Sequence, residues 1–527
     1  MSEPRPIFAA ENLTLERKRG DRPAIAELTL GARRGDVLAV LGREGSGRDI
    51  LLAALLGELP GRATKAGSLT LGDGGDDGPR LTYLPGPESR VLAPFVSTLA
   101  QLTRIVARTL SLSRKEAREK LHGALEHLPH TPDFLARLSR PPRRVACRER
   151  AFALLVTALA QDPDAILADD ALAGLEPSES EEMASLLLKE QSRRGFALVY
   201  FTGDPVVATR LGGRIAILRE GKLTDHGTIE QLQSTKSHSY THVLLRAAPR
   251  LGQRPRDARR KPRAEPLLQV RSFAFEKADD PRRGAAEGIT FDLRRGASLA
   301  LIGEHGSGRR ALIRAVIGLE PAPQGRIIFD SVDIGILSRA MLARLRKRVG
   351  FVTGDDRALD PRMTVGGTIE EPMRAHMRLP AEERKSAASA VLKRVGLGDM
   401  IARQKAGALS ALDRRRLQIA RVIAANPQLV VLFEPLEGLD ALGQALILDL
   451  LCEMREREGP ALLVVTANFA IAEALADDAL ILKAGRIVAR GTIAELVRAP
   501  QDAYVRRLVA AVSAAPADGL SQAAAQV

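Results

Sequence analysis

The sequence predicts two α/β domains in tandem, each built on a mostly parallel sheet with helices on both faces. Two observations lead to this prediction. A strand-like apolar run enters a glycine-rich loop twice, in DVLAVLGREGSGRD and again in ASLALIGEHGSGRR. Further apolar runs, such as DAILAD and LVVLFE, alternate with helical stretches. Short apolar runs that alternate with helices are typical of parallel strands buried on both faces.

The chain is one unit written twice. Gly42 aligns with Gly303 and Tyr240 with Tyr504, a repeat of about 260 residues. Each unit opens with short alternating strands (LTLERK; LLQVRSFAFE) and then enters the glycine-rich loop and a helix. A helical stretch follows, and apolar strands such as FALVYFT and ALLVVT close the unit.

The joins between the domains can be placed from composition. We expect a first domain over residues 1–248, a linker over 249–265, a second domain over 266–512 and a disordered tail over 513–527. The stretch RAAPRLGQRPRDARRKPR is rich in Pro and Arg and has no period, which suits an exposed linker. That its basic residues bind lipid headgroups is an alternative.

Bulk properties restrict the compartment and the partners. The only cysteines among the 527 residues, Cys147 and Cys452, lie in different repeats and lack metal-ligand spacing, which indicates a reduced, cytosolic protein. No signal segment opens the chain, and its longest apolar run, AFALLVTALA, is too short to span a bilayer. The net charge of +14 is spread over both repeats without interleaved aromatics, so we expect no nucleic-acid partner. A solvated surface and a membrane-proximal position both remain open.

Both glycine-rich loops depart from the phosphate-loop template G-x-x-x-x-G-K-[ST]. In the template, backbone N–H groups cradle phosphates, Lys reaches the β and γ oxygens and the hydroxyl holds Mg²⁺. Here Arg48 and Arg309 replace the lysine, while Asp49 and Arg310 replace the hydroxyl residue. Either the loops bind nucleotide or their glycines only serve a strand–helix turn. The expected nucleotide-binding residues are Gly42, Gly45, Ser46, Gly47, Arg48, Asp49, Gly303, Gly306, Ser307, Gly308, Arg309 and Arg310.

Longer stretches point to one family. The segment GLEPAPQGRIIFDSVDIGILSRAMLARLRKRVGFV closely resembles the ATP-binding-cassette ATPases of dipeptide, oligopeptide and nickel importers, and LLGELPGRATKAGSLTLGD looks similar to the same family. SHSYTHVLLRAAP and QDAYVRRLVAAV resemble that family's carboxy-terminal extension. The resemblance covers nearly the whole chain apart from the linker and tail. It implies two nucleotide-binding domains, each with a helical subdomain and that extension.

The resemblance also assigns roles to individual positions in the first unit. Asp169 matches the aspartate that orients Mg²⁺, and Asp170 stands in place of the catalytic glutamate, one methylene shorter. Gly203 occupies the switch-histidine position, and the glutamine position falls at Pro85 or Gly86. Magnesium is therefore expected, if at all, in the first site only.

In the second unit the losses differ. The Mg²⁺ aspartate is replaced by Phe433, while the catalytic glutamate survives as Glu434. Ala467 stands at the switch-histidine position and Thr353 at the glutamine position, and only the loop ending at Asp440 looks ordinary.

The signature motif, L-S-G-G-Q at a helix start, is also altered. The second unit has LSALD, which keeps Ser410 but loses both glycines, and the first unit has VACRE at residues 145–149. Side chains then crowd the helix-start amides that face a γ-phosphate in the family.

These residues predict an importer-type subunit that binds ATP and hydrolyses it weakly or not at all. By resemblance it docks on transmembrane permease subunits at the inner face of the membrane, and its two repeats pair with each other. Because several catalytic elements are altered together, this prediction is favoured over the alternative of a working but slow ATPase. The alternative function is a soluble pseudo-ATPase scaffold or regulator that binds a protein partner without transport. A translation-type tandem cassette is disfavoured by the short linker.

Overall fold

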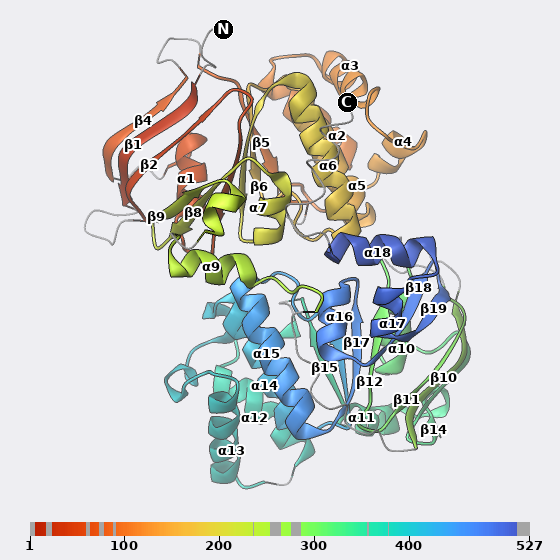
Figure 1. Cartoon of the computed structure of the whole chain (residues 1–527). Helices are drawn as coiled ribbons and strands as arrows, with labels where there is room; N and C mark the ends of the chain where they lie inside the picture. Colours follow the sequence, from red (N-terminus) through yellow and green to blue (C-terminus); the bar gives the residue numbers. More distant parts are fainter. Residues whose placement is uncertain are drawn as a thin grey trace. The chain divides into compact units, whose positions relative to one another are not determined.

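The computed structural model describes residues 6–16, 24–59, 64–72, 78–87, 91–234, 237–252, 265–275, 286–355, 358–377 and 379–513. These residues form two compact units, one within residues 1–248 and one within 249–513, whose elements are labelled in Figure 1. Residues 253–264 of the expected linker and 514–527 of the expected tail lie outside the described residues. The expected domain boundaries stay a prediction.

The first unit contains a three-stranded antiparallel sheet, ordered β2-β1-β4, and a six-stranded sheet, ordered β5-β6-β7-β3-β8-β9. In the larger sheet β9 is antiparallel to β8, while the other neighbouring strands are parallel. The strands are β1 (Pro6–Glu16), β2 (Ile25–Arg33), β3 (Val37–Gly42), β4 (Thr64–Leu71), β5 (Leu81–Pro85), β6 (Ala165–Asp169), β7 (Ala197–Thr202), β8 (Arg214–Arg219) and β9 (Lys222–Gly227).

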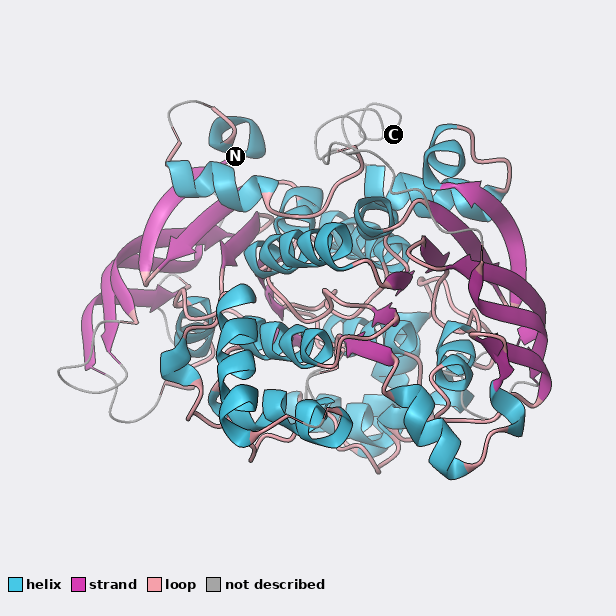
Figure 2. Ribbon diagram, turned by 90° about the horizontal axis from the view of Figure 1, so that it is seen from below, coloured by secondary structure: helices cyan, strands magenta, loops and turns pink. Residues whose placement is uncertain are grey.

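Helices cover both faces of the larger sheet. They are α1 (Arg48–Leu55), α2 (Thr98–Thr109), α3 (Arg114–Leu125), α4 (Phe134–Leu138), α5 (Cys147–Leu159), α6 (Pro177–Arg194), α7 (Pro205–Leu211), α8 (Ile229–Leu232) and α9 (Ser239–Arg246). Helices α2, α3 and α5 pack on one another as a helical subdomain. In Figure 2 the antiparallel sheet of each unit forms a curved layer of strands beside the helices.

The unbroken apolar run of β7 has a structural cause, because this strand is buried on both faces. Side chains alternate across a strand, so successive residues enter different cores. Leu198 and Tyr200 pack in the core that contains α2–α6, whereas Val199 and Phe201 pack with α1 and the antiparallel sheet. The strand order places β7 between β3, which leads into the glycine-rich loop, and β6, which ends at the acidic pair.

The second unit repeats this arrangement, with a four-stranded sheet ordered β11-β10-β13-β14 and a six-stranded sheet ordered β15-β16-β17-β12-β18-β19. Here β19 is the antiparallel edge strand. The strands are β10 (Pro266–Phe275), β11 (Ala286–Arg294), β12 (Ser298–Ile302), β13 (Gln324–Phe329), β14 (Val332–Asp333), β15 (Val349–Thr353), β16 (Leu429–Phe433), β17 (Ala461–Thr466), β18 (Asp478–Lys483) and β19 (Arg486–Thr492). The helices are α10 (Arg309–Val316), α11 (Arg339–Arg346), α12 (Val365–His376), α13 (Ala381–Arg394), α14 (Ala411–Ala424), α15 (Ala441–Glu458), α16 (Phe469–Leu475), α17 (Ile493–Arg498) and α18 (Ala503–Ser513).

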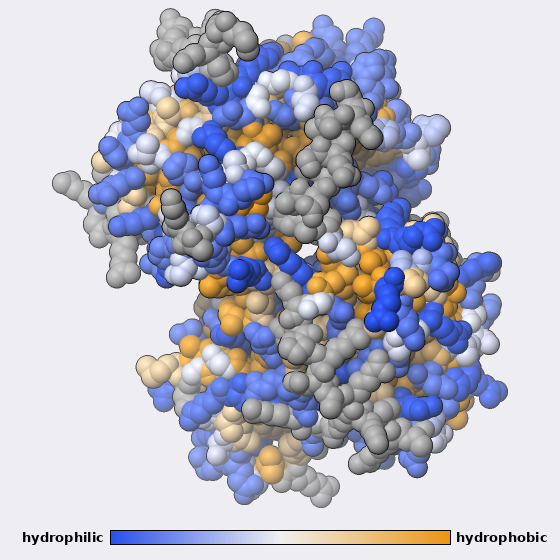
Figure 3. Space-filling model, in the orientation of Figure 1, coloured by the Kyte–Doolittle hydropathy of each residue, from blue (hydrophilic) through white to orange (hydrophobic). Residues whose placement is uncertain are grey.

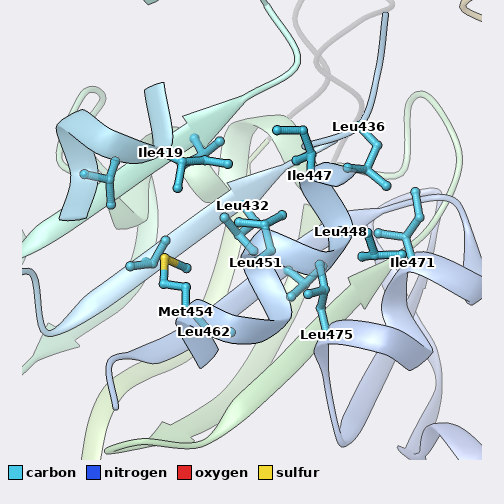
Figure 4. Packing of buried hydrophobic residues seen from close by; sticks show 14 of the residues in the cluster. Ile419, Leu432, Leu436, Ile447, Leu448, Leu451, Met454, Leu462, Ile471 and Leu475 are labelled. Carbon is cyan, nitrogen blue, oxygen red and sulfur yellow. The ribbon is translucent and has the colours of Figure 1, made fainter. Parts of the chain in front are cut away.

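A long helix closes one face of the second sheet. Figure 4 shows Ile447, Leu448, Leu451 and Met454 of α15 in the cluster that contains Leu432 of β16. The packing of α15 against β16 therefore supports the end of the strand that leads to Glu434.

Hydrophilic residues are widespread on the face shown in Figure 3, with hydrophobic residues between them. Within the described ranges, no helix combines the length and the apolar character that crossing a bilayer requires.

Candidate functional site

The first glycine-rich loop joins β3 to α1 in the geometry that the sequence predicts. Gly45 has φ 78° and Gly47, the N-cap of α1, has φ 99°. A Cβ atom on Gly47 would lie 2.4 Å from the Ala24 carbonyl oxygen, so the close approach excludes any side chain there. Helix α1 then starts at Arg48, with its N-terminal amides facing the loop.

The second loop has the same geometry between β12 and α10. Gly306 has φ 81° and Gly308, the N-cap of α10, has φ 93°. A Cβ atom on Gly303 would lie 2.3 Å from the Leu482 carbonyl oxygen. Both loops thus form a strand–turn–helix cradle with a helix dipole behind it, an arrangement that suits anions.

In the first unit, the arginine that replaces the template lysine is paired with an acid of its own unit. Arg48 Nη2 donates to Asp170 Oδ2 at 2.8 Å, and the two side chains are 20% and 34% exposed. Arg48 Nη1 is buried and has no hydrogen-bond partner among the described residues. The pair joins the start of α1 to the end of β6, and Asp170 itself lies in the left-handed region at φ 44°.

The neighbouring Asp169 has a different partner. The Tyr83 hydroxyl donates to Asp169 Oδ2 at 3.1 Å. Burial, and next the charge of Asp170, raise the pKa of Asp169. Burial, and next the charge of Asp169, raise the pKa of Tyr83 well above its ordinary range, so the tyrosine keeps its proton as a donor. The expected magnesium aspartate thus accepts a hydrogen bond from Tyr83.

In the second unit, the carboxylate at the equivalent position, Glu434, has three hydrogen-bond donors. Arg309 Nη1 donates to Glu434 Oε1 at 2.8 Å, and the Arg309 side chain is only 6% exposed. Glu434 Oε1 also accepts the Ala467 N–H at 3.0 Å, and Oε2 accepts the Thr466 hydroxyl at 2.9 Å. Three of the about four acceptor positions of this carboxylate are therefore occupied by groups of its own unit.

Next to this pair, Arg310 stacks on an aromatic ring. Its guanidinium carbon lies 5.4 Å from the centroid of Phe433, the residue at the magnesium-aspartate position. An aromatic ring and a guanidinium group provide no oxygen ligand for a hard cation. The second site therefore does not fit Mg²⁺, and within the described ranges no group of three or more His, Cys, Asp or Glu residues is placed to hold a metal ion.

The signature-like positions serve their own helix starts. Ser410 is the N-cap of α14, where its hydroxyl accepts the Asp413 N–H at 3.1 Å and also bonds Asp413 Oδ2 at 2.9 Å. In the first unit α5 starts at Cys147, and Glu149 accepts the Ala146 N–H at 3.3 Å. Both segments lie at helix starts, as expected, and both present side chains where the family has glycine.

Sequence reasoning missed one buried arginine in each unit. In the first turns of α5, Arg150 Nε donates to the Pro87 carbonyl at 3.1 Å, and Arg150 Nη1 donates to the Val145 carbonyl at 2.7 Å. In α14, Arg415 Nη2 donates to the Gly354 carbonyl at 2.8 Å, and Arg415 Nη1 to the Pro435 carbonyl. Each arginine ties the helical subdomain to the segment after the expected glutamine position. The sequence offered no distinctive signal, because each arginine lies among other charged residues at the start of its helix, in CRERAF and ALDRRRLQ.

Comparisons with known proteins find similarity to ABC transporter proteins. Residues 286–437 match the ABC transporter family. The "Glutathione import ATP-binding protein GsiA" of Escherichia coli (strain K12) is 27% identical over 567 residues, which cover 97% of this chain and 90% of that protein. The protein of the same name from Shigella flexneri is 27% identical over 563 residues, with the same coverage. Among solved structures, cbiO1 from Clostridium perfringens, part of the ABC transporter complex cbiONQ, has a TM-score of 0.40 and 27% identity over 44% of this chain and 91% of that chain.

Fold, loops and family match point to one class: residues 286–437 match the ABC transporter family, and both units have the α/β fold that the resemblance to ATP-binding-cassette ATPases implies. Within that class it resembles the glutathione import ATP-binding protein over nearly its whole length. The resemblance predicted from the sequence is confirmed. The residue roles in the two sites stay predictions.

Proposed function

We propose that this chain is the ATP-binding subunit of an importer of small peptides and that it hydrolyses ATP weakly or not at all. Full-length similarity to glutathione import ATP-binding proteins supports the importer assignment. As in importers of this class, the chain would dock on transmembrane permease subunits at the cytoplasmic face of the membrane. Its domains would be residues 1–248 and 266–512, joined by 249–265 and followed by a tail at 513–527, and the two domains would pair with each other.

Nucleotide would bind at the two glycine-rich loops, through the twelve loop residues predicted above. The left-handed glycines and the helix starts of α1 and α10 support an anion site. In the first loop, Arg48 Nη1 is buried and has no hydrogen-bond partner among the residues that the structure describes, which supports binding of an anionic acceptor such as a phosphate oxygen. ATP supplies that oxygen when it binds.

The observation that carries the weak-hydrolysis proposal is the Arg309–Glu434 pair with its two further donors. Asp170 and Glu434 are the carboxylates at the catalytic position, so any residual hydrolysis would depend on them. Both are paired with the arginine that replaces the loop lysine. We propose Asp169 as the one residue that would bind Mg²⁺, and only in the first site.

The test is calorimetric titration of the purified chain with ATP, first in EDTA and then with Mg²⁺. Binding with little or no phosphate release is expected. No heat of binding in either buffer would contradict the nucleotide-binding proposal.

Purification of the tagged chain from its native membrane separates the importer subunit from the alternative scaffold. An importer subunit is expected to bring permease subunits with it. Recovery with a partner that has no membrane span would favour the scaffold.

A further inference from the structure

The last helix of the second unit contacts its glycine-rich loop through a tyrosine. The Tyr504 hydroxyl, on α18, accepts the N–H of Glu304 at 2.9 Å, although the two residues are 200 positions apart. Tyr504 is only 5% exposed. Asp502 caps the start of α18 by accepting the Tyr504 N–H at 2.7 Å, which fixes the tyrosine at the first turn.

The side chain of the same loop residue is held by an arginine one turn further along α18. Arg507 Nη2 lies 2.7 Å from Glu304 Oε2, and the Glu304 side chain is 17% exposed. Arg507 also lies 5.4 Å from the Tyr504 ring centroid, and Lys483 lies 5.1 Å from it. Backbone and side chain of Glu304 are therefore both tied to one helix.

This contact has an electrostatic consequence because Glu304 is the second residue of the loop. A carboxylate beside a phosphate cradle opposes anion binding unless a cation neutralises it. In the first unit the equivalent loop residue is Arg43, which is itself a cation, and the residue equivalent to Arg507 is Val243, which is 55% exposed. Neutralisation by the terminal helix is thus a property of the second unit.

We propose that α18 controls the polyphosphate affinity of the second loop. When α18 is docked, Arg507 cancels the Glu304 charge and Tyr504 fixes the loop backbone. When α18 is displaced, for example by a partner that binds this helix, the loop carboxylate loses the Arg507 cation and the loop backbone loses the Tyr504 hydrogen bond, and the affinity of the loop for polyphosphate falls. This inference rests on the proposed nucleotide binding.

Hydrogen exchange on the whole chain, read by mass spectrometry without nucleotide, tests the structural part. Loss of one hydrogen bond of about 1 kcal/mol predicts about fivefold faster exchange in peptides covering 303–308 for Tyr504→Phe. Peptides covering 42–47 are expected to stay unchanged. Arg507→Ala should also speed exchange at 303–308, whereas Arg506→Ala, which removes an arginine bonded to the Pro500 and Gln501 carbonyls, should not.

The same variants test the effect on ATP binding. Hydrogen exchange is measured with increasing ATP in EDTA, and binding is read as slower exchange in peptides covering 303–308. Arg507→Ala is expected to need at least about fivefold more ATP for half-protection, the effect of one charge at about 4 Å in bulk water. Arg506→Ala should match the wild type. Equal exchange and equal ATP dependence in wild type, Tyr504→Phe and Arg507→Ala would overturn the inference. Absence of ATP protection in the wild type, with faster exchange in Tyr504→Phe, would instead overturn the proposed nucleotide binding.

Discussion

Arg309 and Glu434 stand 125 positions apart in the sequence and form a 2.8 Å ion pair in the second unit. Arg48 and Asp170 form the equivalent pair in the first unit. In both units, the arginine at the position of the template lysine thus pairs with the carboxylate at the position expected of the catalytic glutamate. Each ion pair joins the start of the helix after the glycine-rich loop to the residue that follows β6 in the first unit and β16 in the second.

Removal of the arginine is expected to destabilise the second unit more than the first. Arg309→Ala leaves Glu434, which is 21% exposed, without its cation, and we expect a loss of about 2 kcal/mol in the free energy of unfolding. Arg48→Ala should cost less than about 1 kcal/mol, because Asp170 is 34% exposed. Urea denaturation measures the stability losses of both variants, and hydrogen exchange assigns each loss to one of the two units. A larger loss for Arg48→Ala would contradict the ranking.

Arg309→Lys is the matched control for this series. It keeps the charge that faces Glu434 and restores the template residue, so its loss of stability should be smaller than that of Arg309→Ala. Equal losses for the two variants would show that packing of the guanidinium, not its charge, holds the loop.

The buried Arg415 is expected to be a major stabilising residue of the second unit. It is 1% exposed and donates to the carbonyls of Gly354, Pro435 and Glu437. Arg415→Ala should lower the free energy of unfolding by about 3 kcal/mol, since it leaves several buried acceptors unpaired. Thermal unfolding measures this change.

The control for Arg415 is an arginine on the same helix. Arg421 is 40% exposed and pairs with Glu371 at 3.0 Å, so Arg421→Ala should cost less than about 1 kcal/mol. Similar losses for the two variants would contradict the structural role of Arg415.

ATP binding at the second loop should depend little on Mg²⁺. Arg309 and Arg310 place two permanent charges where the lysine and the metal-binding hydroxyl stand in the template, and guanidinium groups bind phosphate well. We expect affinities in EDTA and in Mg²⁺ to differ by less than about tenfold, or about 1.4 kcal/mol. In the first loop Asp49 should weaken binding, because repulsion at about 4 Å costs about 1–4 kcal/mol.

Hydrogen exchange of the whole chain, measured with ATP in EDTA and in Mg²⁺, separates the two loops. Protection of 303–308 reports ATP binding at the second loop, and protection of 42–47 reports it at the first. Phe433→Asp should introduce a Mg²⁺ requirement in the second loop by restoring a carboxylate. Strict Mg²⁺ dependence in the wild-type second loop, or tight binding by the first loop alone, would rule out this charge replacement.

The sequence predicted the fold well because its signals are local. The apolar runs at DAILAD and LVVLFE became β6 and β16, and both glycine-rich loops formed strand–turn–helix cradles. The antiparallel edge strands β9 and β19 were not predicted, because short edge strands have no distinctive period.

The contacts within the sites were less predictable. The ion-pair partners of the loop arginines were not predicted, since a sequence does not fix where a long side chain points. The contact of Tyr504 with Glu304 spans 200 positions and depends on how α18 docks. The burial of Arg415 reverses the usual expectation that arginine faces solvent.

The central claim is that the two sites bind ATP without turning it over, and steady-state phosphate release by the whole chain tests it most directly. The assay uses saturating ATP and Mg²⁺, with the Asp170→Ala, Glu434→Ala double variant as the background. The account predicts release below about one per second, the lower end of typical turnover numbers, and no difference between wild type and double variant. Release at about one per second or faster that the double variant abolishes would contradict it.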